Sequence, residues 1–490
     1  MKRRYFVKLS GTTVISAIVI PPALQSCMGS MNMNMNMGSS VTVKEGSFDV
    51  ALPIPSEVGT TAPLATKSST FAVVKGKSTA TLTYQSNILG PTIRVNNGQT
   101  VNAVLQNNLS EETNIHWHGL KVPANMDGHP KDLTQPGGSF NYVLPINQRA
   151  GTYWYHPHPH KKTGKQVHAG LAGMFIVNDN EEAALNLPSG DFEVPLVIQD
   201  KRFRGDQLSY APTMMEVMTG YFGETVIVNG TASPVLTVAT RWYRFRILNG
   251  STARVYNLAL SNGADLTVIG NDGGLLAAPE KVKEILLGPG ERADVLINFT
   301  GISAGTEVFL LSKTFNVGSA QGTQQFKIMK FSVATTSADT FSLPASLSAI
   351  TTLAPASASK TRSFDIGVMG MGGMMMAGMH TINGKTFDIV RIDETVQAGA
   401  TEIWEFNNLA GDEIHPIHIH AVQFQVLSRS GGRGSLTAME KGWKDTVLVM
   451  PREKVSLIMT FPLNNKGVFV FHCHNLEHED DGMMLNFEII

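Results

Sequence analysis

Short runs of apolar and β-branched residues recur along most of this chain, whereas apolar residues at helical spacing are scarce. The runs are rich in Val, Ile, Thr and Phe and are separated by Gly, Pro and Asn, as in "GLAGMFIVND" at residues 170–179. Branched and aromatic side chains pack well on a pleated sheet, and the separating residues favour turns. The pattern therefore predicts an all-β protein.

The length of the chain predicts more than one domain. A chain of 490 residues is too long for a single compact core. We expect three β domains of sandwich size, at residues 41–180, 190–335 and 363–490. The segment 336–362 is rich in Ser, Thr, Ala and Pro, which predicts a linker that runs over the surface.

The overall charge of the chain is close to zero. Lys and Arg total 39, and Asp and Glu total 40. This balance gives no indication of a nucleic acid or a strongly anionic surface as partner. We expect the protein to act as a monomer.

Residues 1–27 have the composition of an export signal, and we exclude them from the fold. They combine a basic head with an apolar run of about ten residues, which is too short to span a membrane. Arg3 and Arg4 resemble a twin-arginine signal, and "LQSC", which ends at Cys27, resembles a bacterial lipobox. A lipid on Cys27 would tether the exported protein to a membrane of the periplasm or cell envelope. The alternative is an ordinary signal that happens to contain Cys27.

Two segments of the chain are rich in methionine. Residues 28–40, "MGSMNMNMNMGSS", contain five, and residues 368–379, "VMGMGGMMMAGM", contain six. Thioether sulfur is a soft ligand that suits Cu(I), so both segments are candidates for binding it. The alternatives are a flexible tether for the first segment and an apolar loop that fills an irregular gap for the second.

Ten of the 14 histidines fall into four tight clusters. The clusters are "HWHG" (His116, His118), "HPH" (His156, His158), "HPIHIH" (His415, His418, His420) and "HCHNLEH" (His472, His474, His478). Side chains two residues apart in a strand share one face, so each His-x-His presents two imidazoles together. One such pair is often structural. Four pairs in two distant regions indicate transition-metal binding, because neutral imidazole is the commonest ligand for these metals.

One of the two cysteines lies inside the last cluster. If His472 and His474 face one way along a strand, Cys473 faces the other way. Three further ligands can reach that side: His415, His478 and Met483. Two His, one Cys thiolate and a weak axial Met form the ligand set of a blue-copper electron-transfer site. If Cys27 is lipidated, no intrachain disulfide is possible, which also favours metal chemistry for this thiol.

These motifs resemble those of the multicopper oxidases, in particular the branch of periplasmic copper efflux (cuprous) oxidases, with laccases as close relatives. The resemblance covers nearly the whole mature chain and includes "NIHWHGLKVP", "GTYWYHPHPHKKTGKQV", "RFRILNGSTARVYNLAL", "INGKTFDI" and "GWKDTV". It implies an all-β fold of three cupredoxin-like Greek-key β-sandwich domains. It also implies a cluster of three coppers between the first and third domains.

The resemblance implies four copper ions and a ligand set for each. The type 1 copper would take His415, Cys473, His478 and Met483. The type 2 copper would take His116 and His418, and the type 3 pair would take His118, His156, His158, His420, His472 and His474. The four remaining histidines are expected at the surface or behind the ligands: His129, His160, His168 and His380.

By the same resemblance, the protein couples one-electron oxidation of a donor to four-electron reduction of dioxygen to water. Cys473 would carry electrons from the type 1 copper to the other three. Asp127, shortly after "HWHG", and Glu479, directly after the last type 1 histidine, would deliver protons. The simpler interpretations are a turn residue for Asp127 and a solvated acidic run for Glu479.

The methionine-rich segments favour Cu(I) as the donor, as in copper detoxification. In the efflux branch, Met and Asp residues hold a substrate copper near the type 1 site. Here Asp412 matches the expected Asp, but Glu413 stands where a Met is expected, so laccase-like oxidation of phenols is an alternative. A copper-sequestering lipoprotein without activity is a third hypothesis. The candidate substrate-binding residues are Asp412, Glu413, Met369, Met371, Met374, Met375, Met376 and Met379.

Overall fold

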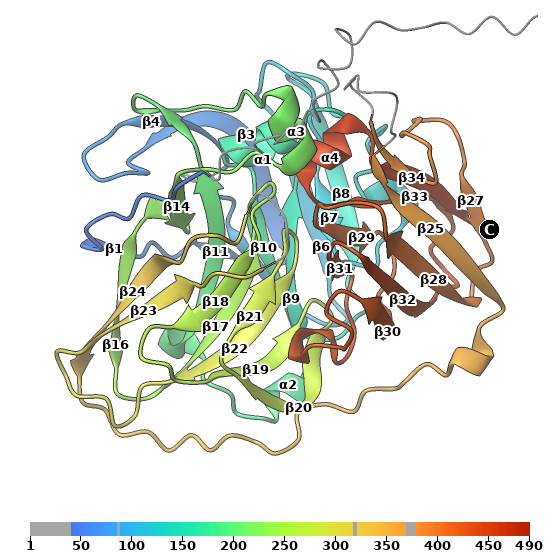
Figure 1. Ribbon diagram of the computed structural model, residues 1–490. Helices are drawn as coiled ribbons and strands as arrows, with labels where there is room; N and C mark the ends of the chain where they lie inside the picture. The colour runs from blue at the N-terminus through green and yellow to red at the C-terminus, as the bar shows by residue number, and fades with distance from the viewer. Residues whose placement is uncertain (1–40, 86–88, 317–320, 369–378) are drawn as a thin grey trace, which may run out of the picture. The chain divides into compact units, whose positions relative to one another are not determined.

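Strands arranged in sheets dominate a computed structural model of the chain (Figure 1). The structure describes residues 41–85, 89–316, 321–368 and 379–490. The export signal, Cys27, the first methionine-rich segment and most of the second lie outside these ranges. The prediction of an all-β protein is confirmed.

The N-terminal third of the described chain forms two sheets that enclose one apolar core. The first has the order β4 (Thr79–Tyr84), β3 (Thr61–Phe71), β6 (Thr100–Asn107), β8 (Ser139–Pro145). The second has the order β2 (Glu57–Val58), β5 (Thr92–Asn96), β10 (Gly173–Asn178), β9 (Gly151–His156), β7 (His116–His118). Inward-facing residues such as Leu64, Leu105 and Trp117 are fully buried between them. Buried and exposed positions alternate along β6, so one face of the strand packs in the core while the other faces solvent.

The middle third forms two larger sheets around a second core. The first has the order β1 (Val50–Ala51), β16 (Pro234–Ala239), β24 (Phe326–Thr335), β23 (Glu307–Ser312), β18 (Tyr256–Leu260), β21 (Ile285–Leu287). The second has the order β15 (Thr231–Ala232), β14 (Thr225–Val228), β11 (Glu193–Lys201), β17 (Trp242–Asn249), β22 (Arg292–Asn298), β19 (Leu266–Asn271), β20 (Gly274–Val282). A short hairpin joins β12 (Phe203–Arg204) to β13 (Gln207–Leu208).

The C-terminal third forms the last two sheets. One has the order β26 (His380–Ile382), β25 (Lys360–Val368), β28 (Thr401–Asn408), β32 (Glu453–Thr460), β30 (Phe424–Gly431). The other has the order β27 (Glu394–Val396), β34 (Met484–Ile489), β33 (Gly467–Cys473), β29 (His415–Ile419), β31 (Thr446–Val449). Trp404, Phe471 and Phe487 pack between the two sheets in a third core.

The domain boundaries stay a prediction. The first residues of the described chain, however, pack with the middle sheets and not with the N-terminal ones. Val43 and Leu52 lie in the middle core, and Val50 in β1 pairs with Pro234 in β16, although residue 41 was expected to open the first domain. Residues 336–359 contain one short 3-10 helix, Pro355–Ser357, and Figure 1 shows this segment running without a strand between β24 and β25.

Strand register brings the histidine motifs together. His116 of β7 stands opposite His156 of β9, and His418 of β29 stands opposite His472 of β33. Because side chains alternate along a strand, the second histidine of each pair lies on the same face as the first. Cys473, which is opposite Ile417, therefore faces the third core.

Short helices lie beside these strands. Figure 1 shows α1 (Thr163–Ala169), α3 (Met214–Thr219) and α4 (Leu476–Asp481) together, and α2 (Asn180–Ala183) lies apart from them. Asp480 at the end of α4 accepts hydrogen bonds from the first backbone N–H groups of α1, Thr163 N at 3.1 Å and Gly164 N at 2.9 Å. These bonds satisfy donors that the first turn of a helix leaves free, and they tie α4 to the N-terminal third of the chain.

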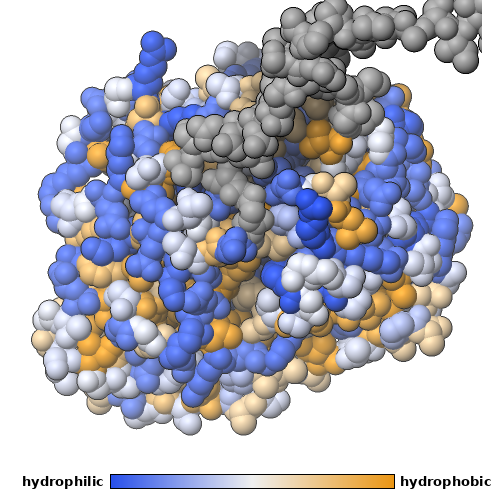
Figure 2. Space-filling view, viewed as in Figure 1, coloured by the Kyte–Doolittle hydropathy of each residue, from blue (hydrophilic) through white to orange (hydrophobic). Residues whose placement is uncertain are grey.

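The surface mixes polar and apolar residues. On the face shown in Figure 2, hydrophilic and hydrophobic residues are interspersed. Exposed apolar side chains such as Ile54, Met214 and Leu463 lie in separate parts of the chain, two in connecting segments and one in α3, as is ordinary at a protein surface. Within the described residues, no helix has both the length and the apolar character needed to cross a membrane.

Candidate metal centres

A triangle of ligand atoms lies in the C-terminal third. Cys473 is the last residue of β33, His415 is the first of β29, and His478 lies in α4. Cys473 Sγ is 3.5 Å from His415 Nδ1 and 3.6 Å from His478 Nδ1, and the two nitrogens are 3.2 Å apart. All three side chains are buried. The strand pair and the helix thus bring together three ligands that are far apart in the sequence.

This triangle fits a transition metal. Imidazole nitrogen binds such ions at about 2.0–2.1 Å and thiolate sulfur at about 2.3 Å, so an ion close to the plane of the triangle can reach all three atoms. Trigonal coordination by two His and one Cys is the pattern of blue-copper sites. Burial lowers the pKa of His415 to about 3 and lowers that of His478, so both imidazoles are neutral and able to bind. Burial raises the pKa of the Cys473 thiol, which a bound cation must offset to hold the thiolate.

Met483 lies beside this triangle. Its side chain is fully buried in the same apolar core as Cys473, and its carbonyl accepts a hydrogen bond from Cys473 N at 3.0 Å. The apolar surroundings exclude water from the three ligands. A soft, uncharged thioether in such a place is suited to the weak fourth position of a copper site.

Eight histidines form a second, larger centre. They come from β7, β9 and the residues after them, and from β29 and β33 with the residues after them. The eight are His116, His118, His156, His158, His418, His420, His472 and His474, each at most 1% exposed. Nε2 of His116 is 3.3 Å from Nε2 of His418, and Nε2 of His472 is 3.2 Å from those of both His158 and His420. The cluster therefore joins the N-terminal and C-terminal thirds.

Several nitrogens in this cluster are placed where they could bind a metal ion. His118 Nδ1, His156 Nε2 and both ring nitrogens of His474 are buried without a hydrogen-bond partner among the described residues. Leaving a buried polar nitrogen unpaired costs free energy, so a bound ion is the simplest way to satisfy them. Three sets of ligand nitrogens within 4.8 Å of one another can each hold an ion: His116, His418 and His420; His116, His118 and His156; His158, His420 and His472.

Hydrogen bonds behind the ligands fix which nitrogen faces inward. Nδ1 of His116 donates to the Asp127 carbonyl at 2.8 Å, and Nδ1 of His418 donates to the Asp445 carbonyl at 2.8 Å. With the proton held on Nδ1, the Nε2 lone pair is free for a metal. Burial lowers the pKa values of these histidines, to about 3 for His158, so they are neutral near pH 7.

The two predicted proton donors lie against this cluster. Asp127 Oδ2 accepts from His420 Nδ1 at 2.7 Å, and Glu479 Oε2 is 3.1 Å from His472 Nδ1. Burial raises the pKa of Asp127 well above its ordinary value. Burial alone would also raise the pKa of Glu479, but His158 and His472 outweigh it and lower that pKa. The pKa values of the two carboxyl groups are therefore shifted in opposite directions, a common arrangement for an acid and a base in one site.

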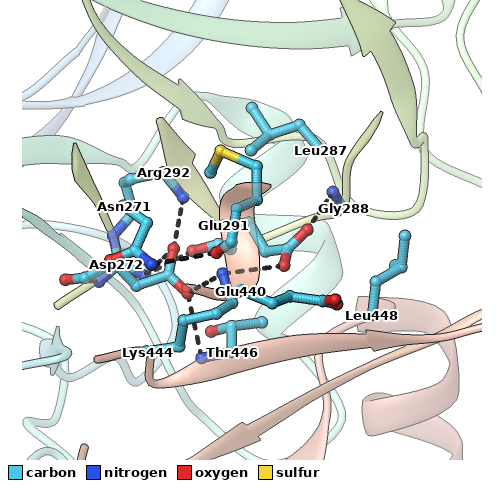
Figure 3. A network of polar contacts seen from close by, with 12 residues as sticks. Asn271, Asp272, Leu287, Gly288, Glu291, Arg292, Glu440, Lys444, Thr446 and Leu448 are labelled. Carbon is cyan, nitrogen blue, oxygen red and sulfur yellow. Dashed lines mark hydrogen bonds and ion pairs between the residues drawn. The ribbon is translucent and has the colours of Figure 1, made fainter. Parts of the chain in front are cut away.

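A network of buried charges, which the sequence alone did not reveal, supports His118. His118 Nε2 donates to Asp445 Oδ1 at 3.1 Å, and Arg292 pairs with the same carboxylate. Lys444 lies between the carboxylates of Asp272 and Glu291, at 2.7 and 3.2 Å, as Figure 3 shows. Lys444 and Asp445 belong to the "GWKDTV" motif, and this pair of charged residues was the feature of the sequence that could have indicated the network.

This network fixes the orientation of His118. The hydrogen bond from Nε2 leaves Nδ1 of His118 free for a metal. In His116 and His418 the free nitrogen is Nε2 instead. Arg292 comes from the middle third of the chain, whereas Asp445 comes from the C-terminal third. The charges of Asp272 and Glu291 outweigh burial and raise the pKa of Lys444, so the lysine stays charged inside the protein.

The four histidines outside the predicted ligand sets have different surroundings. His129 is buried and contacts Asn486 Oδ1 through Nε2 at 2.9 Å. His168 is buried beside Tyr210, and His160 is partly exposed beside Phe387. His380 is fully buried, and its ring stacks on that of His478 with centroids 4.0 Å apart.

The predicted substrate-binding residues are only partly described. Asp412 is exposed and pairs with Arg452 at 2.8 Å, while burial and Asp412 raise the pKa of Glu413 to about 7. Met379 donates from its backbone N–H to Asp481 Oδ2 at 3.1 Å. Met369, Met371, Met374, Met375 and Met376 lie outside the described residues.

Comparisons with known proteins place the chain in one protein family. Three multicopper oxidase family models match residues 65–182, 204–330 and 362–490. A multicopper oxidase, Mco, of Staphylococcus haemolyticus is 37% identical over 430 residues, which span 85% of this chain and 87% of the relative. A laccase of Bacillus subtilis is 32% identical over 465 residues, which span 82% of this chain and 88% of the relative.

Solved structures give the same result. The crystal structure of the multicopper oxidase McoA of Aquifex aeolicus aligns with a TM-score of 0.82 at 38% identity. The alignment covers 91% of this chain and 100% of that one. The likeness thus extends over all three groups of sheets.

Proposed function

Because this chain belongs to the multicopper oxidase family, copper-dependent oxidoreductases with dioxygen as acceptor, we propose that its donor is Cu(I) and that it works in copper detoxification. The supporting observation is that His478 is fully buried beside α3, a helix that contains Met214, Met215 and Met218. A laccase-like oxidation of phenols is the second candidate, because a laccase is among the relatives.

The proposal assigns each ligand set as the family motif orders it. The type 1 copper takes His415, Cys473, His478 and Met483, and the type 2 copper takes His116 and His418. The type 3 pair takes His118, His156, His158, His420, His472 and His474. The short distances between facing nitrogens and the unpartnered nitrogens of His118, His156 and His474 support this assignment. When bound, the four coppers supply one centre that accepts single electrons and another that delivers four of them to dioxygen.

Reduction of dioxygen to water also needs four protons, which the chain must supply in a dry cavity. We assign this task to Asp127 and Glu479. The Asp127 Oδ1 atom is buried and has no hydrogen-bond partner among the described residues, so it is free to carry a proton beside His116, 3.6 Å away. Glu479, whose pKa is lowered, holds a negative charge against His158 and His472 and receives the protons that follow.

The donor side favours a small soft donor. His478 is fully buried, and its Nε2 donates to the Met218 carbonyl of α3 at 3.0 Å. Met214 and Met215 lie in the same helix, and the backbone N–H of Met379 donates to Asp481, which lies three residues after His478 in α4. Because His478 is fully buried, a phenol has no exposed face of this ring to contact, whereas the methionines of α3 and Met379 offer soft thioether ligands for Cu(I).

Oxygen uptake by the copper-loaded protein tests this proposal. Cu(I) and a simple phenol would be compared as donors, in the parent and in a variant with residues 369–378 replaced by a Gly/Ser linker of the same length. Val368 and Met379 stay, because Val368 pairs with His380 and Met379 with Asp481. Faster uptake with Cu(I), reduced by the replacement, supports the proposal. Faster uptake with the phenol, improved by the replacement, supports the laccase alternative.

Location and tethering are also proposals. We propose that residues 1–27 direct export and that Cys27 carries a lipid, which would place the protein at a membrane of the periplasm or cell envelope. A non-catalytic, copper-sequestering lipoprotein would take up no oxygen in the assay above. Mass spectrometry of the mature protein and of Cys27→Ser tests the anchor, since only the parent would carry the added mass.

A further inference from the structure

His380 is a buried histidine that no ligand set uses, yet it lies against one of the ligands. Its imidazole stacks on that of His478 with centroids 4.0 Å apart and an angle of 18° between the planes. His478 in turn lies 3.6 Å through Nδ1 from Cys473 Sγ. A continuous line of contacts thus leads from His380 through His478 to the cysteine.

Asp481 holds His380 in this stacked position. Its Oδ2 atom accepts from His380 Nδ1 at 2.9 Å and from the backbone N–H groups of Met379 and His380 at 3.1 Å each. The proton is therefore on Nδ1 of His380. Nε2 is buried and has no hydrogen-bond partner within the described ranges. A ring oriented this strictly by a carboxylate has a role that depends on its orientation.

The outer side of His478 is closed to a donor. The side chain is fully buried, the Met218 carbonyl covers Nε2, and His380 covers one face of the ring. An electron from outside must therefore cross at least one further group before it reaches His478. Electronic coupling falls steeply with distance and with gaps between atoms, so a group in direct contact with His478 offers a path, and the stacked ring of His380 is such a group.

Asp481, which holds His380, also borders a cavity. A cavity of about 290 Å³ is lined by Asp481 together with His160, Phe387 and Asp480, among others. The side chain of Asp481 is only 6% exposed, and that of His380 is fully buried. A donor in this cavity would lie beside Asp481, which is two groups away from the ligand His478.

We propose that electrons enter this protein through His380, which Asp481 holds against His478, and not by direct contact of the donor with His478. One electron leaves the donor, which is oxidised by one unit, and reduces the type 1 copper from Cu(II) to Cu(I). Neither imidazole is oxidised or changes its protonation, because the rings only provide the path. The inference rests on the proposed assignment of His478 as a type 1 ligand, but not on the identity of the donor.

Reduction of the type 1 copper in the absence of oxygen tests the path. Hexaammineruthenium(II) would be mixed rapidly with the copper-loaded protein, and loss of the blue absorption would be followed in time. His380→Leu removes the stacked ring and should slow this loss about tenfold. His380→Phe keeps a flat ring of similar size and should restore most of the rate. His129→Leu, at a buried histidine that touches no ligand, is the control and should leave the rate unchanged.

A second pair of variants examines the role of Asp481 in positioning. Asp481→Asn keeps an acceptor for His380 Nδ1, so the rate should stay close to that of the parent while the type 1 potential rises with the lost negative charge. Asp481→Ala frees the ring, and the rate should fall as in His380→Leu. Electron paramagnetic resonance and the potential of each variant show whether the type 1 site itself is intact.

Two outcomes would overturn the inference. One is an unchanged rate in His380→Leu with an unaltered type 1 spectrum. The other applies if His380→Leu fails to bind copper. It is a rate in His380→Phe far below that of the parent, or a rate in Asp481→Ala equal to that of the parent. Because the ruthenium complex replaces the natural donor, these results do not depend on whether the parent oxidises Cu(I), which the oxygen-uptake experiment measures separately.

Discussion

The two candidate metal centres are built in different ways. The triangle of His415, Cys473 and His478 is made within the C-terminal third and is surrounded by the apolar residues of one core. The histidine cluster joins strands from opposite ends of the chain, and charged residues such as Arg292 and Asp445 support it from behind. One centre depends on packing within a sandwich, and the other depends on how separate parts of the chain meet.

This difference indicates how each centre responds to change. Apolar packing around the triangle keeps its atoms in place, so only a change of the ligand itself should abolish that centre. Buried charges around the cluster are satisfied only in pairs, so loss of one partner leaves an uncompensated charge. Substitutions behind the ligands should therefore damage the cluster and leave the triangle intact.

The largest effect is expected from Cys473→Ser. Serine lacks the soft thiolate, so the blue absorption and the oxidase activity should both disappear while the apolar core keeps the chain folded. Absorption spectra, copper content and circular dichroism measure the three properties. Met483→Leu serves as the comparison and should retain the blue colour. Strong blue absorption in Cys473→Ser would contradict the assignment of the type 1 site.

Arg292→Met separates the two centres. It removes the partner of Asp445 in a fully buried pair, which should lower the free energy of unfolding by about 3–5 kcal/mol and loosen His118. We expect loss of copper from the cluster with retention of the blue band, measured by copper analysis and electron paramagnetic resonance. The control is Lys441→Met, which breaks an exposed pair with Glu280 and should cost at most about 1 kcal/mol. Equal copper loss from both centres would refute the distinction.

Asp127→Asn and Glu479→Gln test chemistry in the cluster without changing its ligands. Both variants keep the size of the side chain but lose the titrating group, so all four coppers should stay while reoxidation by dioxygen slows by about 100-fold. Stopped-flow reoxidation and copper analysis give the two quantities. Glu477→Gln is the matched control, since Glu477 bonds Tyr210 and Tyr221 instead of the histidines. Copper loss in Asp127→Asn would indicate a structural role.

The smallest effect is expected at a buried ionic group remote from both centres. Arg246 and Arg244 outweigh burial and lower the pKa of Glu182 to about 2, from an ordinary value of 4.5. Its charge therefore stabilises the fold above pH 4.5, and this contribution is lost as the pH falls towards 2. Glu182→Gln should lower the free energy of unfolding by about 2 kcal/mol at pH 7 and by much less near pH 2.

Denaturant unfolding at several pH values measures this difference. Copper content should not change in Glu182→Gln, because this residue contacts Arg244 and Arg246 and no candidate ligand. If copper were lost as readily as in Arg292→Met, the importance of Arg292 would lie in general stability and not in its link to His118. If the difference persisted unchanged at pH 2, the ionic explanation would be wrong.

The sequence predicted the fold class and the family, because both follow from local patterns. Branched residues between turn residues indicate strands, and His-x-His repeats survive as pairs on one face whatever the tertiary structure. His116, His418 and Cys473 are all buried, as the motifs lead one to expect of metal ligands. The ligand assignment itself stays a prediction until copper is measured.

The residues behind the ligands could not be predicted in this way. Arg292 and His118 are 174 positions from each other in the printed sequence and meet through Asp445, a contact that depends on docking of separate sheets. His380 was expected at the surface or behind the ligands, but its stacking on His478 follows from the β25–β26 pairing that only the structure provides. Local periodicity carries no information about such contacts.

The facing nitrogens of His116 and His418 have a consequence for the lifetime of the protein. These residues are 302 positions apart, and His158 and His472 are 314 apart, so each bound ion closes a very long loop of chain. Ions that bind only the folded chain shift the balance against unfolding. Protein made under copper starvation should therefore open more often, meet proteases sooner and be cleared faster, so that copper supply would set how much of the enzyme a cell keeps.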